Sequence, residues 1–193
     1  MDSLKGQFLV AMPDMGDERF KDTVIYLVGH GEDEGAMGLV VNQSLDDMRF
    51  ADILEELGIG EKDDIIQLPD EVKGRQVLRG GPVQRGRGFV LHSPDYFRQD
   101  NSYPVSEDVC LTATLDVLKA MAFKNSPADA IFALGYCGWS PGQLEEEIKN
   151  NGWLTVPFSR ELLFEAPIET RYEAALGKLG ITRASLSSVA GNA

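Results

Sequence analysis

Three apolar runs that follow one another near the N-terminus place the strongest constraint on the fold. Residues 7–12 (QFLVAM), 23–30 (TVIYLVGH) and 37–42 (MGLVVN) are rich in β-branched and large apolar residues, which is typical of strands. Only short segments rich in Pro, Asp and Gly separate them, and residues 31–35 (GEDEG) predict a hairpin tip. A doubly wound parallel fold needs a helix between successive strands, so this pattern disfavours it.

The rest of the chain mixes helical and strand patterns. Residues 130–136 (AIFALGY) are almost wholly apolar, as expected of a central strand covered on both faces. Apolar residues recur at helical spacing over residues 50–57, and we expect Asp46 or Asp47 to cap that helix. Further helices are predicted over residues 114–123, 141–150 and 168–179.

These patterns predict an α+β fold. We expect a single domain over residues 1–184, with a mixed, largely antiparallel β-sheet core and helices packed around it, and a flexible tail over residues 185–193. The length of 193 residues and a hydrophobic content of 43% suit one well-formed core. No apolar stretch is long enough to span a membrane and the N-terminus lacks a basic signal-peptide region, so we expect a cytoplasmic protein.

The charge is unevenly distributed. The chain has 31 acidic and 18 basic residues, a formal net charge of −13, which argues against a surface that binds nucleic acid as a whole. Residues 73–87 nevertheless hold five basic residues and no acidic one. This basic segment is either a solvated hairpin or a site for an anionic ligand, and its candidate ligand-binding residues are Arg79, Gly80, Gly81, Arg85 and Arg87.

A second segment follows the central strand. In residues 138–148 (GWSPGQLEEEI), Ser140 as N-cap and Gln143 three residues later form the pattern of a capping box. Capping accounts for most of this motif, but a helix N-terminus behind a strand is also a site where anions bind. Gly138, Trp139 and Gln143 are therefore further candidate ligand-binding residues.

Catalytic signals are sparse. His92 ends an apolar strand and is a candidate general acid or base, although a histidine in that position is more often structural. Cys110 and Cys137 lie in apolar runs and are expected to be buried, reduced thiols. No His, Cys or carboxylate cluster has metal-ligand spacing, and nucleotide-binding glycine motifs are absent, so neither a metal nor a cofactor is predicted.

Taken together, the blocks of sequence resemble the AlgH/YqgE family of small bacterial proteins. The resemblance covers nearly the whole chain. It rests on Phe8–Pro13 (FLVAMP), Asp17 and Phe20, Val24–Tyr26 and His30, Gly35–Asn42, Gly80–Val83 (GGPV), Arg87–His92 (RGFVLH), Gly138–Trp139, Gly142–Glu145 and Trp153–Leu154. The family implies an α+β domain with a β-rich core, and its members are labelled as transcriptional regulators.

Two hypotheses about function follow. The first is a regulatory protein that acts by binding a protein or a small anionic ligand; direct DNA binding is disfavoured because no predicted helix carries a basic face. The alternative is a hydrolase or transferase for an anionic metabolite, in which His92 and Arg79 or Arg87 share a pocket with the turn at residues 138–143. The oligomeric state cannot be read from the sequence.

Overall fold

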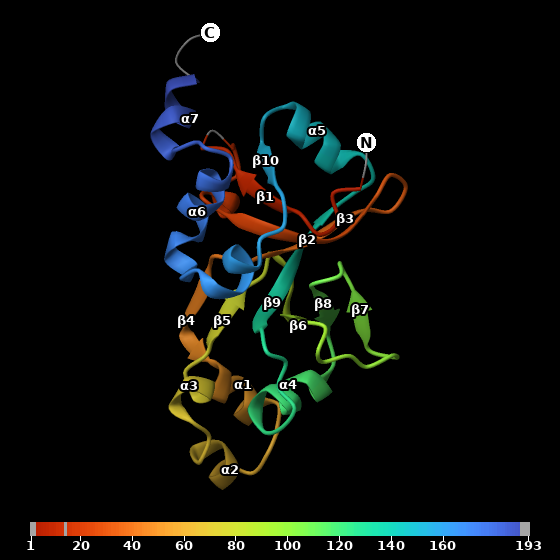
Figure 1. The fold of residues 1–193 in the computed structure, drawn as a ribbon, viewed down its shortest axis with the longest axis vertical. Helices are drawn as coiled ribbons and strands as arrows, with labels where there is room; N and C mark the ends of the chain where they lie inside the picture. The colour runs from red at the N-terminus through yellow and green to blue at the C-terminus, as the bar shows by residue number, and fades with distance from the viewer. Residues whose placement is uncertain (1–2, 14, 190–193) are drawn as a thin grey trace. The chain divides into compact units, whose positions relative to one another are not determined.

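The computed structural model describes residues 3–13 and 15–189, and its contacts group the chain into two compact units (Figure 1). The first unit contains the residues up to 43 and those from 136 onward, and the second contains residues 44–135. Strand β9 (Ala130–Trp139) belongs in its first part to the second unit and in its last part to the first. Both units combine strands with helices, which confirms the predicted α+β class.

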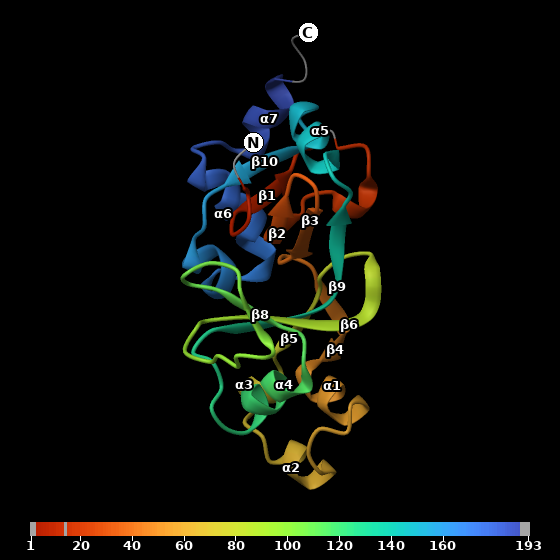
Figure 2. The ribbon, with the colours of Figure 1, turned by 90° about the vertical axis from the view of Figure 1, so that its right-hand side faces the viewer.

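The first unit is built on an antiparallel sheet in the order β10-β1-β2-β3-β9 (Figure 2). Its strands β1 (Phe8–Ala11), β2 (Val24–Gly31) and β3 (Gly35–Val40) are the three apolar runs of the N-terminal region. Strand β10 (Trp153–Val156) extends the sheet beyond β1. Among the described residues between β1 and β2, the 3₁₀ turn η1 (Glu18–Phe20) is the only helical element, as the short loop predicted.

Helices pack against this sheet. Helix α5 (Gln143–Lys149) places Leu144 in a buried cluster with alternate strand residues such as Leu9 and Ile25. Helix α6 (Arg171–Lys178) contacts β1 and β2. All four residues of β1 are buried, because side chains on both of its faces are covered. Two short turns precede α6: the π-helix η2 (Glu161–Glu165) and the 3₁₀ turn η3 (Ile168–Thr170).

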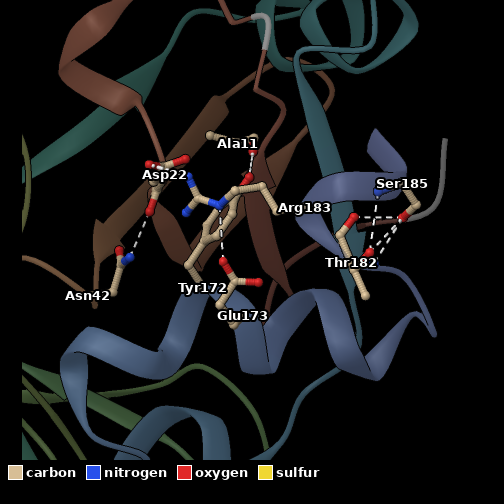
Figure 3. Close-up of polar contacts among 8 residues, drawn as sticks. All are labelled: Ala11, Asp22, Asn42, Tyr172, Glu173, Thr182, Arg183 and Ser185. Atoms are coloured by element: carbon tan, nitrogen blue, oxygen red, sulfur yellow. Dashed lines mark hydrogen bonds and ion pairs between the residues drawn. The ribbon is translucent and has the colours of Figure 1, made fainter. Parts of the chain in front are cut away.

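Polar contacts tie the C-terminal helices to the sheet (Figure 3). The Tyr172 hydroxyl donates a hydrogen bond of 2.8 Å to the carbonyl oxygen of Ala11. The Arg183 guanidinium forms ion pairs with Asp22 at 2.8 Å and Glu173 at 3.0 Å. It also lies 4.8 Å from the centre of the Tyr172 ring. These contacts join segments that are about 160 residues apart in the sequence.

Part of the predicted C-terminal tail is helical. Residues Arg183–Val189 form helix α7. At its start the Thr182 N–H donates to Ser185 Oγ and the Ser185 N–H donates to Thr182 Oγ1, at 2.9 and 3.3 Å. This reciprocal pairing satisfies donors that a helix start would otherwise leave free. Residues 190–193 lie outside the described residues, and the flexibility of residues 185–193 stays a prediction.

Helix α5 begins later than the capping pattern predicted. Its N-cap is Gly142, with φ +78°, rather than Ser140. The Ser140 N–H still donates to Gln143 Oε1 at 3.0 Å, so one half of the predicted capping box forms. The left-handed conformation at Gly142 lets the chain turn between that bond and the first helical residue.

The second unit has a mixed sheet in the order β4-β5-β9-β6-β8-β7. Strand β5 runs parallel to β9, with Val77 opposite Phe132, whereas the pairs β4–β5, β6–β8 and β7–β8 are antiparallel. The prediction of a mixed, largely antiparallel sheet is therefore confirmed. The strands are β4 (Ser44–Arg49), β5 (Gln76–Arg79), β6 (Val83–His92), β7 (Ser102–Pro104) and β8 (Cys110–Thr112).

Four helices accompany this sheet, and their buried residues form its core with Val77, Val90 and Phe132. The first helix starts after residues 44–49, which form β4, so the prediction that Asp46 or Asp47 caps it was wrong. Within the described part of the chain, no helix is long and apolar enough to cross a membrane. The helices are α1 (Phe50–Glu56), α2 (Lys62–Ile66), α3 (Asp70–Lys73) and α4 (Leu115–Ala122).

Candidate functional site

The second unit contains a cavity of about 480 Å³ between strands β6 and β9 and helices α1 and α4. Such a volume lies in the range of about 300–1,000 Å³ that is typical of small-molecule sites. Its lining is mostly apolar. The apolar side chains are Met48, Ile53, Leu57, Val90, Ala113, Leu115, Leu118, Phe132 and Leu134, and the other lining residues are Glu56, Arg85, Gly86, Arg87, Gly88, Thr112 and Thr114.

Two glycines on β6 shape this cavity in different ways. Side chains alternate along a strand, so Gly86 and Gly88 share a face of β6 with the buried Val90. A Cβ at Gly88 would lie only 2.7 Å from Cε2 of Phe132, and a Cβ at Gly86 would meet no atom within 4 Å. Phe132 therefore packs directly on Gly88, and the open space in this part of the cavity lies at Gly86, where an ordinary side chain would fill it.

The polar groups of this cavity are few and differ in exposure. The hydroxyl oxygen of Thr114 is buried without a hydrogen-bond partner. Arg85 and Arg87 flank Gly86 on β6, are exposed and line the cavity, and the Arg87 guanidinium lies 5.2 Å from the centre of the Phe89 ring. No ion pair joins either arginine to a carboxylate among the described residues, although Arg87 donates to Gln84 Oε1 at 3.3 Å.

The other candidate residues of the basic segment, Arg79, Gly80 and Gly81, do not line this cavity. Arg79 is exposed at the end of β5. Gly80 and Gly81 lie where β9 passes very close: a Cβ on Gly80 would be 2.3 Å from the carbonyl oxygen of Gly135. Gly135 itself has φ +77°, and a Cβ there would be 2.5 Å from the carbonyl oxygen of Gly81. Close backbone approach accounts for all three glycines.

His92 is fully buried and both of its ring nitrogens are engaged. Nδ1 lies 2.9 Å from the carbonyl oxygen of Ser93, which can only accept, so Nδ1 carries the proton. Nε2 of the neutral ring then accepts from the Thr112 hydroxyl at 2.8 Å, and that hydroxyl lies 2.9 Å from Ser102 Oγ. Burial lowers the pKa of His92, which favours this neutral form. Although Thr112 lines the cavity, His92 does not.

The candidates after the central strand belong to the first unit, and they surround one carboxylate. Glu147 Oε2 accepts from the indole N–H of Trp139 at 2.9 Å and from that of Trp153 at 2.7 Å. Its Oε1 accepts from Gln143 Nε2 at 2.9 Å. Gly138, which precedes Trp139 in the sequence, is exposed on β9. Gly138, Trp139 and Gln143 do not line the 480 Å³ cavity of the second unit, so a pocket shared with the basic segment stays a prediction.

Cysteine thiols can act as nucleophiles, and clustered acidic side chains could bind a metal ion. Cys110 and Cys137 are buried, reduced thiols, as predicted. Burial raises the pKa of Cys137 to about 12, which keeps it protonated and weakly nucleophilic at neutral pH. Over the described ranges, no three His, Cys, Asp or Glu side chains gather in an arrangement that could hold a metal ion.

The sequence did not predict most of the residues that line the cavity. Arg85 and Arg87 were candidates, but the apolar residues from α1 and α4 and the hydroxyl of Thr114 were not. One signal was available, because the sequence Arg85-Gly-Arg-Gly88 places two glycines on the same face of a strand. The helical residues carried no such signal, since their spacing is that of ordinary core residues.

The chain is similar to proteins of many bacteria. A sequence model of a family described as DUF179, AlgH-like, matches residues 8–184. A UPF0301 protein of Mesorhizobium japonicum is 53% identical over 190 residues, which is 98% of this chain and 93% of that protein. A UPF0301 protein of Nitrobacter hamburgensis is 51% identical over 98% of this chain and 88% of its own length.

Two solved structures have the same fold. The solution structure of the AlgH protein from Pseudomonas aeruginosa matches with a TM-score of 0.77 at 40% identity, over 97% of this chain and 94% of that one. The crystal structure of a protein from Corynebacterium diphtheriae matches with a TM-score of 0.71 over 97% of this chain and 92% of the other. At 19% identity, the second likeness concerns the fold alone.

Proposed function

The chain belongs to the AlgH-like family, and from the cavity of its second unit we propose that it binds a small amphipathic anion and acts through that binding rather than through catalysis. The apolar part of the ligand lies in the 480 Å³ cavity against Phe132 and Leu118. Its anionic group lies at the rim near Arg85 and Arg87. The observation that carries the proposal is the space that Gly86 leaves open beside these two arginines.

The nature of the lining supports binding over catalysis. Nine of its side chains are apolar, and Glu56 and the two arginines are its only charged residues. His92, the candidate acid or base of the alternative hypothesis, is fully buried, and hydrogen bonds to Ser93 and Thr112 occupy its ring. General acid–base catalysis requires a group that reaches the ligand. We therefore assign His92 no part in the proposed function.

The basic residues support ligand binding over direct DNA binding. Arg79, Arg85 and Arg87 lie in a unit with 16 acidic and 10 basic residues, and its net negative charge opposes binding to the DNA backbone. Any regulatory role would then follow from ligand occupancy or from a protein partner. A titration of duplex DNA at increasing salt tests this: we expect no binding, and affinity with a steep salt dependence that is lost when all three arginines are replaced by alanine would contradict it. We also propose a cytoplasmic location, because both cysteines are reduced thiols.

The ligand proposal is tested by thermal unfolding with straight-chain carboxylates of eight to twelve carbons, below their critical micelle concentrations. A ligand at about 100 times its dissociation constant adds roughly 2.7 kcal/mol to the free energy of unfolding. The matched alcohols test the anionic group, since they keep the chain but lack the charge. We expect the carboxylates to raise the melting temperature more than the alcohols do.

Three variants locate the site. Gly86→Leu fills open space without a steric conflict or a positive φ, so it should fold and abolish the shift. The double variant Arg85→Ala, Arg87→Ala should reduce the rise in melting temperature caused by the carboxylates and leave that caused by the alcohols unchanged. Arg79→Ala is the matched control, because Arg79 belongs to the same basic segment but does not line the cavity. Stabilisation that survives in the Gly86→Leu protein, or no stabilisation by any carboxylate, would overturn the proposal.

A further inference from the structure

A second cavity of about 570 Å³ lies at the end of helix α4, in the same unit. It shares no lining residue with the first cavity. Leu115 and Leu118 of α4 face the first cavity, whereas Asp116 and Lys119 face the second, so two different faces of one helix border the two spaces. The lining of the second cavity consists of Ile59, Gly60, Arg98, Asp116, Lys119, Ala120, Phe123, Lys124 and Asn125.

The charges of this lining are not balanced. Arg98, Lys119 and Lys124 face a single carboxylate, Asp116, and among the described residues none of the three cations forms an ion pair. The unit as a whole is acidic, with 16 acidic and 10 basic residues over 44–135. Cations gathered in a hollow, in a unit with a surplus of carboxylates, create a local positive potential that attracts an anion with more than one charge.

An aromatic ring lies among these cations. Phe123 is 42% exposed, although large apolar residues are usually covered. On one side its ring lies against Gly60, where an added Cβ would be 2.6 Å from Cζ and where φ is +84°. Glycine at position 60 therefore lets the ring sit directly on the backbone, while the exposed part of the ring remains available to a planar group.

We propose that this second cavity binds a small phosphorylated aromatic compound of the nucleotide class. The phosphate pairs with Lys119, Lys124 and Arg98, and the planar base stacks on Phe123. Three cations and one carboxylate give the lining a net charge of +2, which matches a phosphate monoester that carries close to two negative charges at pH 7. This site is additional to the amphipathic-anion site, and neither depends on the other.

The test is isothermal titration calorimetry with adenosine monophosphate in a buffer free of phosphate and at low salt. Adenosine, which lacks the phosphate, and ribose 5-phosphate, which lacks the base, are the matched ligands. We expect adenosine monophosphate to bind and each of the other two to bind at least about tenfold more weakly, a difference that corresponds to about 1.4 kcal/mol. Binding should also weaken as the salt concentration rises. Equal binding of ribose 5-phosphate, or no binding of adenosine monophosphate at millimolar concentrations, would overturn the proposal.

Matched variants assign the contacts. Lys119→Gln with Lys124→Gln removes two exposed charges and should lower the affinity by about tenfold or more. Lys62→Gln removes an exposed charge from the same unit outside the lining and should leave the affinity unchanged. Phe123→Leu keeps an apolar side chain over Gly60 but removes the stacking surface. It should therefore lower the affinity for adenosine monophosphate and leave the affinity for ribose 5-phosphate unchanged. Circular dichroism confirms that each variant is folded.

A further variant separates this proposal from the first one. Arg85→Ala with Arg87→Ala alters the rim of the first cavity only, so it should leave the binding of adenosine monophosphate unchanged. If that variant abolished binding while the Lys119→Gln, Lys124→Gln protein retained it, the nucleotide would occupy the first cavity and the proposal of a second site would be wrong. Loss of carboxylate binding alone would leave the second site intact.

Discussion

The carboxylate of Glu147 should be one of the most important polar groups of the first unit. It accepts the indole N–H groups of Trp139 and Trp153 and the side-chain N–H of Gln143. The two tryptophans are 7% and 2% exposed, so water cannot replace the lost acceptor easily. Replacing Glu147 with alanine leaves two buried donors without partners.

The expected cost follows from these contacts. A buried donor that loses its partner costs about 1–3 kcal/mol, and the exposed Gln143 amide regains water and adds little. Two indole groups therefore predict a loss of about 2–6 kcal/mol in the free energy of unfolding for Glu147→Ala. Such a loss is a large part of the roughly 5–15 kcal/mol that stabilises a typical domain. Glu147→Gln keeps one neutral acceptor oxygen and should lose about half as much.

Tryptophan fluorescence during urea unfolding measures this loss directly. The chain has two tryptophans, and both contact Glu147, so the emission reports the unit to which they belong. The matched control is Glu146→Ala, which removes a neighbouring exposed carboxylate from the first turn of α5 and should cost only about 0.3–1 kcal/mol. Glu147→Ala should also change the emission spectrum of the native protein, because it removes a hydrogen-bond acceptor from both indoles.

The reasoning would be refuted if Glu147→Ala unfolded within about 0.5 kcal/mol of the wild-type protein, or if it lost no more than Glu146→Ala did. Either outcome would mean that the two indole groups find other partners, and that Glu147 does not organise this part of the first unit.

Two further predictions rest on buried titratable groups. Burial lowers the pKa of His92 below its usual value of 6.5, so as the pH falls below about 6.5 the unfolded chain binds the proton first and the free energy of unfolding decreases. Urea titrations at pH 7.5 and 5.5 should show a smaller decrease for His92→Gln, and an equal decrease in both proteins would contradict this assignment. Burial raises the pKa of Cys137 to about 12, so in a Cys110→Ser background iodoacetamide should label it at pH 8 only in urea. Mass spectrometry measures the labelling, and rapid modification of the native protein would disprove the expected protection.

The sequence predicted only part of the first candidate site. Arg85 and Arg87 were recognisable because they lie in a basic segment within an acidic chain. Their relation to Thr114 and Phe132 was not recognisable, since these residues come from separate elements and carry no shared local pattern. The glycines at 80 and 81, which suggested a ligand cradle, are explained by the close approach of β9.

The second candidate site was invisible in the sequence for the same reason. Arg98, Lys119 and Lys124 are spread over 27 positions and do not form a charge run. Phe123 looks like one more apolar residue at the end of a helix, and only the three-dimensional structure shows that the residue is 42% exposed while its ring lies against Gly60. Local composition does not reveal charges that meet only after folding.

The sequence by itself determined the α+β class, the N-terminal hairpin, the apolar central strand and the family. Strand alternation and helical periodicity are local properties of the sequence, so they can be recognised without knowledge of the fold. Tertiary structure alone decided that residues 44–49 pair with β5 as a strand, because partners distant in sequence outweigh a local capping signal. It also decided that Gly86 and Gly88 lie opposite helices α1 and α4. Cavities arise where separate elements fail to fill the space between them, and no single segment encodes that space.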